Sequence, residues 1–264
     1  MTIKAAHELL DMTESRYESG ERGPDPHVHR EHADAWYVLE GELRFWFGLA
    51  GESLDAAAGT LVLVPAGVIH SFANESDRTA RFLNIHAPSK GFAESLRVRR
   101  DAGDYDAERF DSFDPPADGG RSVSDVVVRG PGEGELLELG PNTLLMKAEV
   151  GDGDGTFYLG KMTLARFPGP PPHVHERHLD SFYVLDGTLT LRIGDETVEA
   201  KAGSYAVVPP GNVHTFSNAG EPVRALNIMG PGGFEQYLKE AAAAGTSDPR
   251  ALGEIAARYD FTPA

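Results

Sequence analysis

The sequence predicts an all-β protein made of two similar domains. A set of histidine, aspartate, glycine and proline residues occurs twice along the chain, in the same order. Short segments rich in Val, Leu, Phe and Tyr alternate with turns that contain Gly or Pro, a pattern typical of strands. The composition, with 30 glycines, 18 prolines and 41% hydrophobic residues, is that of a turn-rich globular chain.

The repeated set indicates a duplicated domain. The first copy comprises His27, His29, Asp34, Gly41, Gly59, Pro65, Gly67, His70 and Asn74. The second copy comprises His173, His175, Asp180, Gly187, Gly203, Pro209, Gly211, His214 and Asn218. The only change in spacing is two extra residues between Phe47 and Glu52, opposite an expected hairpin turn at Gly194-Asp195. An insertion at a hairpin tip costs little and leaves the rest of a domain in place.

We expect an N-terminal domain over 1–115, a linker over 116–124 and a C-terminal domain over 125–264. The linker is placed there because the run from Asp114 to Ser122 is polar and rich in Pro and Gly, with no apolar periodicity. Each half is long enough to bury a core of its own. Short helices are predicted after Gly91 and Gly233, and a last one from Asp248 to Tyr259 with proline in its first turn.

Charge and composition exclude several classes of function. A formal net charge of −17 opposes binding to nucleic acid and to anionic membranes. Without cysteine, the chain forms no disulfide, thiolate metal site or iron–sulfur cluster. No segment has the length and hydropathy of a membrane span or the apolar core of a signal peptide, so we expect a cytoplasmic protein. The sequence leaves a homodimer open.

Strand geometry brings the repeated polar residues together. Side chains two residues apart on a strand point the same way, so His27 and His29 share one face. A Pro-x-Gly turn then leads into a strand that carries His70. Asp34 lies on a neighbouring strand. Three imidazoles and a carboxylate would hold a divalent ion and leave coordination positions open, as catalysis requires.

These patterns select the candidate site residues. The predicted metal ligands are His27, His29, Asp34 and His70 in the first half and His173, His175, Asp180 and His214 in the second. The expected apolar lining of the two pockets is Trp36, Val38, Phe72, Phe182, Val184 and Phe216. His32 and His178, two residues before each aspartate, are candidates for supporting a ligand or transferring a proton. His86, which matches Met229, is interpreted as a strand residue satisfied locally.

The motif pair from Gly23 to Gly41 and from Gly59 to Asn74, repeated from Gly169 to Gly187 and from Gly203 to Asn218, resembles the cupin superfamily. The chain is similar to a bicupin, which implies two antiparallel β-barrels of jelly-roll type, each with a metal inside. Among bicupins it looks most like quercetin 2,3-dioxygenases and their pirin-like relatives. That resemblance implies opening of a flavonol or related aromatic or enolic substrate by O₂, with the carboxylate as the catalytic base.

The resemblance also implies a divalent metal, from among Fe, Mn, Ni, Co and Zn, with up to two ions per chain. The family's usual carboxylate is glutamate, whereas both halves here carry aspartate, Asp34 and Asp180. Either the three histidines hold the ion and the aspartate acts beside it as a base, or the strand lies closer to the ion than it does in the family. Two alternatives stay open: another cupin enzyme, such as a decarboxylase or isomerase, and a non-catalytic protein that binds a small molecule through its metal.

Overall fold

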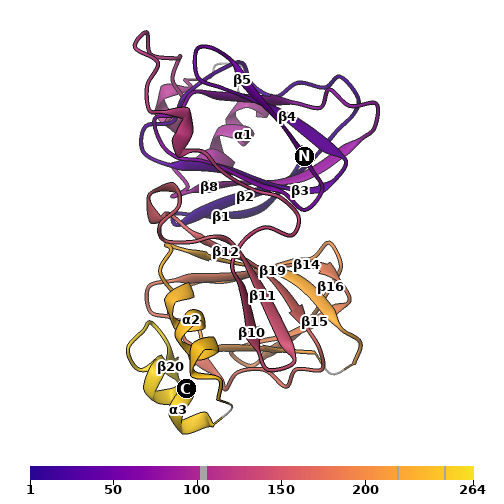
Figure 1. Cartoon of the computed structure of the whole chain (residues 1–264), viewed down its shortest axis with the longest axis vertical. Coiled ribbons are helices and arrows are strands. Elements are labelled where there is room, and N and C mark those ends of the chain that lie inside the picture. Colours follow the sequence, from indigo (N-terminus) through magenta and orange to yellow (C-terminus); the bar gives the residue numbers. More distant parts are fainter. Residues whose placement is uncertain (102–105, 219, 247) are drawn as a thin grey trace. The chain divides into compact units, whose positions relative to one another are not determined.

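The computed structural model describes residues 1–101, 106–218, 220–246 and 248–264 (Figure 1). The chain divides into two compact units. One comprises Met1–Glu133 with Gly151–Thr156, and the other comprises Gly134–Val150 with Phe157–Ala264. Residues 116–124, the predicted linker, lie within the first of these units, and the chain passes to the second after Glu133.

The first unit is built from two antiparallel sheets. Its strands are β1 Thr2–His7, β2 Leu10–Tyr17, β3 Ala33–Glu40, β4 Glu42–Phe47, β5 Glu52–Ala57, β6 Leu61–Val64, β7 His70–Ala73, β8 Ala80–Ala87 and β9 Val127–Arg129. One sheet has the order β1-β2-β8-β3-β6-β9 and the other has the order β5-β4-β7. Because β9 pairs with β6, the chain beyond the predicted linker still belongs to this unit.

The second unit repeats this plan. Its strands are β10 Leu136–Leu139, β11 Asn142–Ala148, β12 Tyr158–Leu164, β13 His173–Val174, β14 Leu179–Asp186, β15 Thr188–Ile193, β16 Glu196–Lys201, β17 Tyr205–Val208, β18 His214–Ser217, β19 Val223–Gly230 and β20 Thr262–Pro263. Its sheets have the orders β10-β11-β12-β19-β14-β17 and β16-β15-β18-β13-β20. The expected two-residue turn at Gly194-Asp195 joins β15 and β16, whereas four residues join β4 and β5. The insertion therefore lies at a hairpin tip, as predicted.

Each core lies between the two sheets of its unit. In the first unit, Trp36 and Val38 of β3 pack with Phe45 of β4 and Phe72 of β7. Alternate strand residues point to the same face, so these side chains line the interior between the sheets while their neighbours point to the opposite face of each sheet. The corresponding cluster of the second unit includes Phe182, Val184 and Leu191. The predicted all-β architecture is confirmed.

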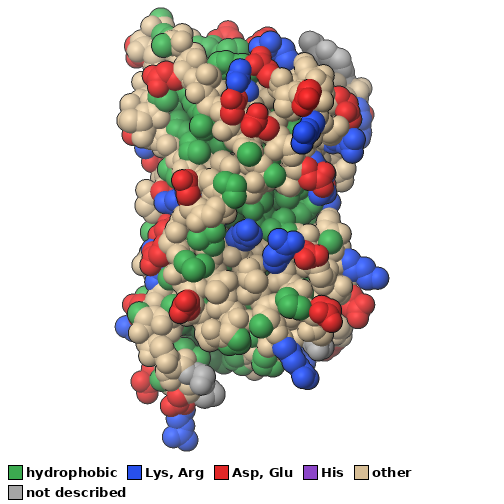
Figure 2. Space-filling model, turned by 45° about the vertical axis from the view of Figure 1, so that its right-hand side comes forward, with side chains coloured by type: hydrophobic (Ala, Val, Ile, Leu, Met, Phe, Trp, Pro, Cys, Tyr) green, Lys and Arg blue, Asp and Glu red, His purple; other side chains and the backbone are tan. Residues whose placement is uncertain are grey.

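Helices are few and short, as predicted. They are α1 Phe92–Asp101, α2 Glu235–Ala244 and α3 Pro249–Ala256, with 3₁₀ turns η1 Glu108–Phe110, η2 Val123–Asp125 and η3 Gly153–Gly155. The Asp248 side chain caps α3 by accepting from the backbone N–H of Arg250, and Pro249 lies in the first turn. None of the helices in the described ranges is long and apolar enough to cross a membrane. On the face shown in Figure 2, basic and acidic side chains are interspersed.

Strand register aligns the polar residues of the repeat. Asp34 lies between His86 of β8 and Val64 of β6. Asp180 lies in the same way between Met229 of β19 and Val208 of β17. Residues that pair directly across antiparallel strands point to the same face. Each aspartate therefore shares the barrel interior with the residue paired to it on the neighbouring long strand.

Gly41→Ala tests a close backbone approach that only glycine permits. Gly41 has a φ of 71°, and a Cβ there would overlap the carbonyl oxygen of Thr79. Gly51 has a similar φ of 68° but nothing within 4 Å of such a Cβ, so Gly51→Ala is the matched control. We expect the control to lose about 1–2 kcal/mol of unfolding free energy from the left-handed conformation alone. Gly41→Ala should lose about 1–3 kcal/mol more from overpacking.

Urea unfolding followed by tryptophan fluorescence measures this difference, because both tryptophans, Trp36 and Trp46, lie in the first unit. Equal losses for the two variants would show that the Thr79 contact is unimportant.

Candidate metal centres

Three histidines and one aspartate of the first unit converge. His27 and His70 form an antiparallel bridge, with backbone N–H···O distances of 3.1 and 3.0 Å in the two directions. His29 follows two residues later, and Asp34, on β3, points its carboxylate toward these histidines. One ligand atom from each of the four residues lies within 4.8 Å of the others. The distances from Asp34 Oδ2 are 3.7 Å to His29 Nε2 and 3.5 Å to His70 Nε2.

The second unit brings three histidines together in the same way. His173 of β13 pairs with His214 of β18, and the ligand atoms of His173, His175 and His214 lie within 4.8 Å of one another. Asp180 is not a member of this group. Its Oδ2 instead lies 3.2 Å from His214 Nε2, and its Oδ1 accepts from Asn227 Nδ2 at 2.6 Å.

Backbone carbonyls fix the orientation of all six imidazoles. Each Nδ1 lies against a carbonyl oxygen, which can only accept, so Nδ1 carries the proton and Nε2 presents its lone pair to the cluster. The accepting carbonyls belong to Asp25, Asp111 and Val68 for His27, His29 and His70, and to Pro171, Asp260 and Asn212 for His173, His175 and His214.

The Nε2 atoms of the first cluster fit a metal ion. His29 Nε2 and His70 Nε2 are buried and have no hydrogen-bond partner among the described residues. A buried nitrogen lone pair without a donor is costly, and a divalent cation would satisfy both. The donor set of imidazole and carboxylate suits first-row divalent ions such as Fe, Mn, Ni, Co and Zn.

Burial keeps key imidazoles in the neutral form that a metal requires. Burial, with the nearby His70 and His29, lowers the pKa of His27 to about 2. Burial, with His214, lowers the pKa of His173 to about 4. His214 behaves differently: burial lowers its pKa, but the Asp180 carboxylate against its Nε2 and the Asn212 carbonyl together outweigh burial and raise the pKa. A metal ion at this histidine would therefore have to displace a proton from Nε2. The pKa of Asp34 is well below its usual value despite burial, because His86, His29 and His70 surround the carboxylate.

Two asparagines that were not predicted as site residues bind the carboxylates. Asn84 donates from Nδ2 to Asp34 Oδ1, and Asn227 donates in the same way to Asp180. The sequence contained the signal, because Leu83-Asn84-Ile85 and Leu226-Asn227-Ile228 match. The Asn side chains therefore direct Oδ2 of each aspartate toward the histidines.

Two aspartates outside the repeated set support the histidine loops. Asp111 accepts from the backbone N–H groups of Arg30 and Glu31 and from His32 Nδ1 at 2.7 Å. Asp260 accepts from three successive backbone N–H groups and from His178 Nδ1 at 2.6 Å. The backbone carbonyl of each also accepts from a cluster histidine. A third matching block, Arg-Phe-Asp at 109–111 and Arg-Tyr-Asp at 258–260, was the sequence signal.

The predicted apolar side chains lie beneath the histidines as core. Trp36, Val38, Phe182 and Val184 are fully buried, and the Trp36 ring centroid lies 5.6 Å from that of His70. Phe72 packs on Trp36 at 5.1 Å, and Phe216 packs on Phe182 at 4.7 Å. In the first unit these rings reach the cluster through Trp36, and in the second they belong to the buried core.

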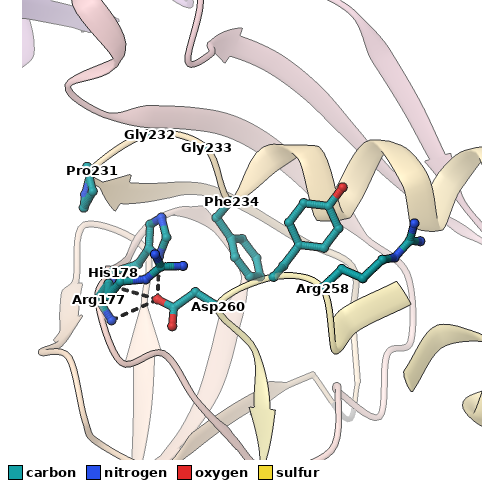
Figure 3. Close-up of a pocket in the computed structure, with 9 residues that line it drawn as sticks. Arg177, His178, Pro231, Gly232, Gly233, Phe234, Arg258 and Asp260 are labelled. Carbon is teal, nitrogen blue, oxygen red and sulfur yellow. Dashed lines mark hydrogen bonds and ion pairs between the residues drawn. The ribbon is translucent and has the colours of Figure 1, made fainter. Parts of the chain in front are cut away.

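Further aromatic rings, not anticipated from the sequence, contact the imidazoles. Phe92 stacks on His86 at 3.5 Å, and Phe261 stacks on His173 at 4.2 Å. Phe234 meets the His175 ring edge-on at 4.6 Å. Beside it is a cavity of about 280 Å³ (Figure 3), lined by Arg177, His178, Pro231, Gly232, Gly233, Phe234, Arg258, Tyr259 and Asp260.

Asp111→Asn should weaken metal binding at the first cluster about 10–100-fold, because the loop that carries His29 loses its anionic acceptor. The matched control is Asp114→Asn, which removes the same charge from an exposed position nearby. Equilibrium dialysis against Co²⁺ measures the affinity. A loss in both variants, or in neither, would contradict the role of Asp111.

The metal-free protein should lose stability on acidification from pH 6.5 to pH 4. The pKa values of His27 and His173 are lowered on folding, so the unfolded chain binds the protons first and stability falls as pH falls. Each histidine contributes about 1.4 kcal/mol per pH unit in this window. Urea unfolding at a series of pH values measures the slope, and His27→Gln should flatten it. A stability that is constant over the window would contradict this account.

Comparisons with known proteins agree with the geometry. A quercetin 2,3-dioxygenase of Bacillus subtilis (strain 168) is 23% identical over 241 residues, covering 81% of this chain and 71% of that protein. A quercetin 2,3-dioxygenase of Aspergillus japonicus is 33% identical over 89 residues, covering 31% of this chain and only 25% of that protein.

Structural similarity extends across both units. The crystal structure of Lactobacillus farciminis oxalate decarboxylase in its formate complex gives a TM-score of 0.58 at 14% identity, and covers 93% of this chain and 86% of that chain. At this identity the likeness concerns the fold alone. The family model for the cupin domain matches residues 13–86 and 161–229, more than half of the chain. The chain therefore belongs to the cupin family and is a bicupin.

Proposed function

We propose that this bicupin is a metal-dependent dioxygenase of the quercetinase type, which cleaves a flavonol or a related aromatic or enolic compound with O₂. The observation that carries the proposal is the convergence of three Nε2 lone pairs beside an aspartate in each unit. The low-identity relationship to two quercetin 2,3-dioxygenases supports the same reaction class. The aromatic rings around both clusters support a flat, hydrophobic substrate.

The histidines would hold a divalent ion in each unit: His27, His29 and His70 in the first, and His173, His175 and His214 in the second. When bound, such an ion supplies a Lewis acid for an enolic oxygen and open positions for catalysis. The backbone carbonyls behind Nδ1 keep each ring from turning away.

The aspartates would act on the substrate's hydroxyl proton. Asn84 and Asn227 donate hydrogen bonds to Oδ1 of Asp34 and Asp180, respectively. The other carboxylate oxygen, Oδ2, therefore faces the cluster. The lowered pKa of Asp34 keeps this carboxylate ionised near neutral pH, as an acceptor must be. His32 and His178 would support this arrangement through Asp111 and Asp260.

A decarboxylase is the second candidate, and one observation favours it. Arg177 is exposed at the cavity beside the second cluster, and it makes no ion pair within the described residues. An exposed guanidinium beside a metal centre suits a substrate carboxylate. Oxygen consumption separates the two candidates, because a decarboxylase that needs no O₂ as reactant releases CO₂ without net uptake.

Elemental analysis of the purified protein tests the metal centres. Wild type should contain up to two ions per chain, and His70→Ala and His214→Ala should each lose about one, since each removes one of three imidazoles. His7→Ala, a histidine outside both clusters, is the control and should retain the wild-type content. Unchanged metal in both cluster variants would refute the site assignment.

Oxygen uptake tests the reaction. The metal-loaded protein should consume O₂ with at least one member of a panel of flavonols and related enols. The double variant Asp34→Asn with Asp180→Asn should lose about 10²–10⁴-fold in rate, the usual contribution of a general base. Absence of uptake with every metal and every substrate would refute the dioxygenase, and CO₂ release without uptake would favour the decarboxylase.

A further inference from the structure

The two metal centres differ at one position next to the carboxylate. His86 pairs across the sheet with Asp34, and Met229 occupies the matching place opposite Asp180. Both side chains are buried. The sequence interpretation of His86 as a residue satisfied locally does not describe its contacts, which lead directly to the first cluster.

His86 connects Asp34 of the first cluster with Asn84 and His32, which lie beside the cluster. Its Nε2 lies 3.1 Å from Asn84 Oδ1 and 3.4 Å from Asp34 Oδ1. The amide oxygen of Asn84 can only accept, so His86 Nε2 is the donor, and His86 Nδ1 lies 2.8 Å from His32 Nε2 in a second hydrogen bond. Asp34 Oδ1 is therefore held from two sides, by His86 and by Asn84, which leaves Oδ2 facing His29 and His70.

His86 also holds the His32 ring against His29 of the first cluster. The His32 ring, bonded to His86, lies with its centroid 4.0 Å from that of His29 at an interplanar angle of 31°. Phe92 stacks on the outer side of His86. Asp34 consequently belongs to the group of ligand atoms that lie within 4.8 Å of one another.

Methionine at 229 cannot make the corresponding hydrogen bonds. The His178 ring lies 6.4 Å from that of His175 at 76°, and it borders the cavity of about 280 Å³. Figure 3 shows His178 and the Asp260 carboxylate together at this cavity, with Phe234 beside them. Asp180 stays outside the histidine group, with its Oδ2 3.2 Å from Nε2 of His214 alone.

We propose that the two centres have different ligand sets, and that His86 is the positioning residue that makes the difference. In the first centre, Asp34 completes a set of three histidines and one carboxylate. In the second, three histidines bind the ion without Asp180, which leaves one more position open. This inference concerns metal binding alone and does not depend on the reaction that the protein catalyses.

The ligand sets predict unequal affinities. A carboxylate adds a negatively charged ligand, so the first centre should bind a divalent ion more tightly than the second. The extra open position of the second centre lies in the unit that also contains the cavity. Occupation of the two centres should therefore be sequential as the metal concentration rises.

Cobalt titration of single-centre variants tests the proposal. His214→Ala leaves the first centre and His70→Ala leaves the second. Added to these backgrounds, Asp34→Asn should weaken Co²⁺ binding at least about tenfold, whereas Asp180→Asn should change it less than about threefold. The visible spectrum of bound Co²⁺, which depends on coordination number, should change with Asp34→Asn and not with Asp180→Asn. Equal losses, or a larger loss with Asp180→Asn, overturn the proposal.

The role of His86 has its own pair of variants. His86→Met in the first-centre background should weaken Co²⁺ binding and shift its spectrum toward that of the second centre. Met229→Leu in the second-centre background, a volume-conserving control, should leave both unchanged. Circular dichroism establishes that the variants are folded; if His86→Met is not, the Asp34 and Asp180 comparison decides. An unchanged affinity and spectrum in folded His86→Met overturns the assignment of His86.

Discussion

The six hydrogen bonds from histidine Nδ1 to backbone carbonyls are the constraint on which both candidate centres depend. A carbonyl oxygen can only accept, so each bond fixes the ring orientation and the tautomer together. In each unit, one of these carbonyls belongs to an aspartate far along the chain, Asp111 or Asp260, whose carboxylate also binds the loop between the histidines and β3 or β14. The barrel's own backbone therefore orients the histidines, and burial keeps imidazoles such as His27 and His173 neutral.

The two units share one duplicated architecture, but single residues make the surroundings of their aspartates different. A histidine in β8 joins Asp34 to the first cluster, whereas a methionine in β19 leaves Asp180 bonded to His214. The difference bears on the aspartate that replaces the family's usual glutamate. Because the aspartate side chain is one methylene shorter, small changes in the residues around it decide whether the carboxylate also coordinates the ion. A bicupin built in this way can hold one ion firmly and keep a second centre open for substrate.

Local periodicity and the repeat were enough to predict the strands, the hairpin insertion, the helices and the convergence of three histidines in each unit, but not the place of Asp180 outside the second group. His27 and His29 with His70 could be predicted because strand alternation and the Pro-x-Gly turn act over short distances. Asp111 and Asp260 were missed because their contacts span about 80 residues, and only a short matching block marked them. The contacts of His86 depend on sheet register, which a single sequence does not specify. The stacking of Phe261 on His173 likewise arises from pairing of the chain's last strand with β13.

The central claim, that two histidine clusters are metal centres with Nε2 as the coordinating atom, is tested most directly by anomalous diffraction from a crystal of the metal-loaded protein. At the absorption edge of the bound element, the account predicts two peaks per chain. One should lie about 2.1 Å from Nε2 of His27, His29 and His70, and the other at the same distance from Nε2 of His173, His175 and His214. Peaks located elsewhere, or coordination through Nδ1, would contradict it.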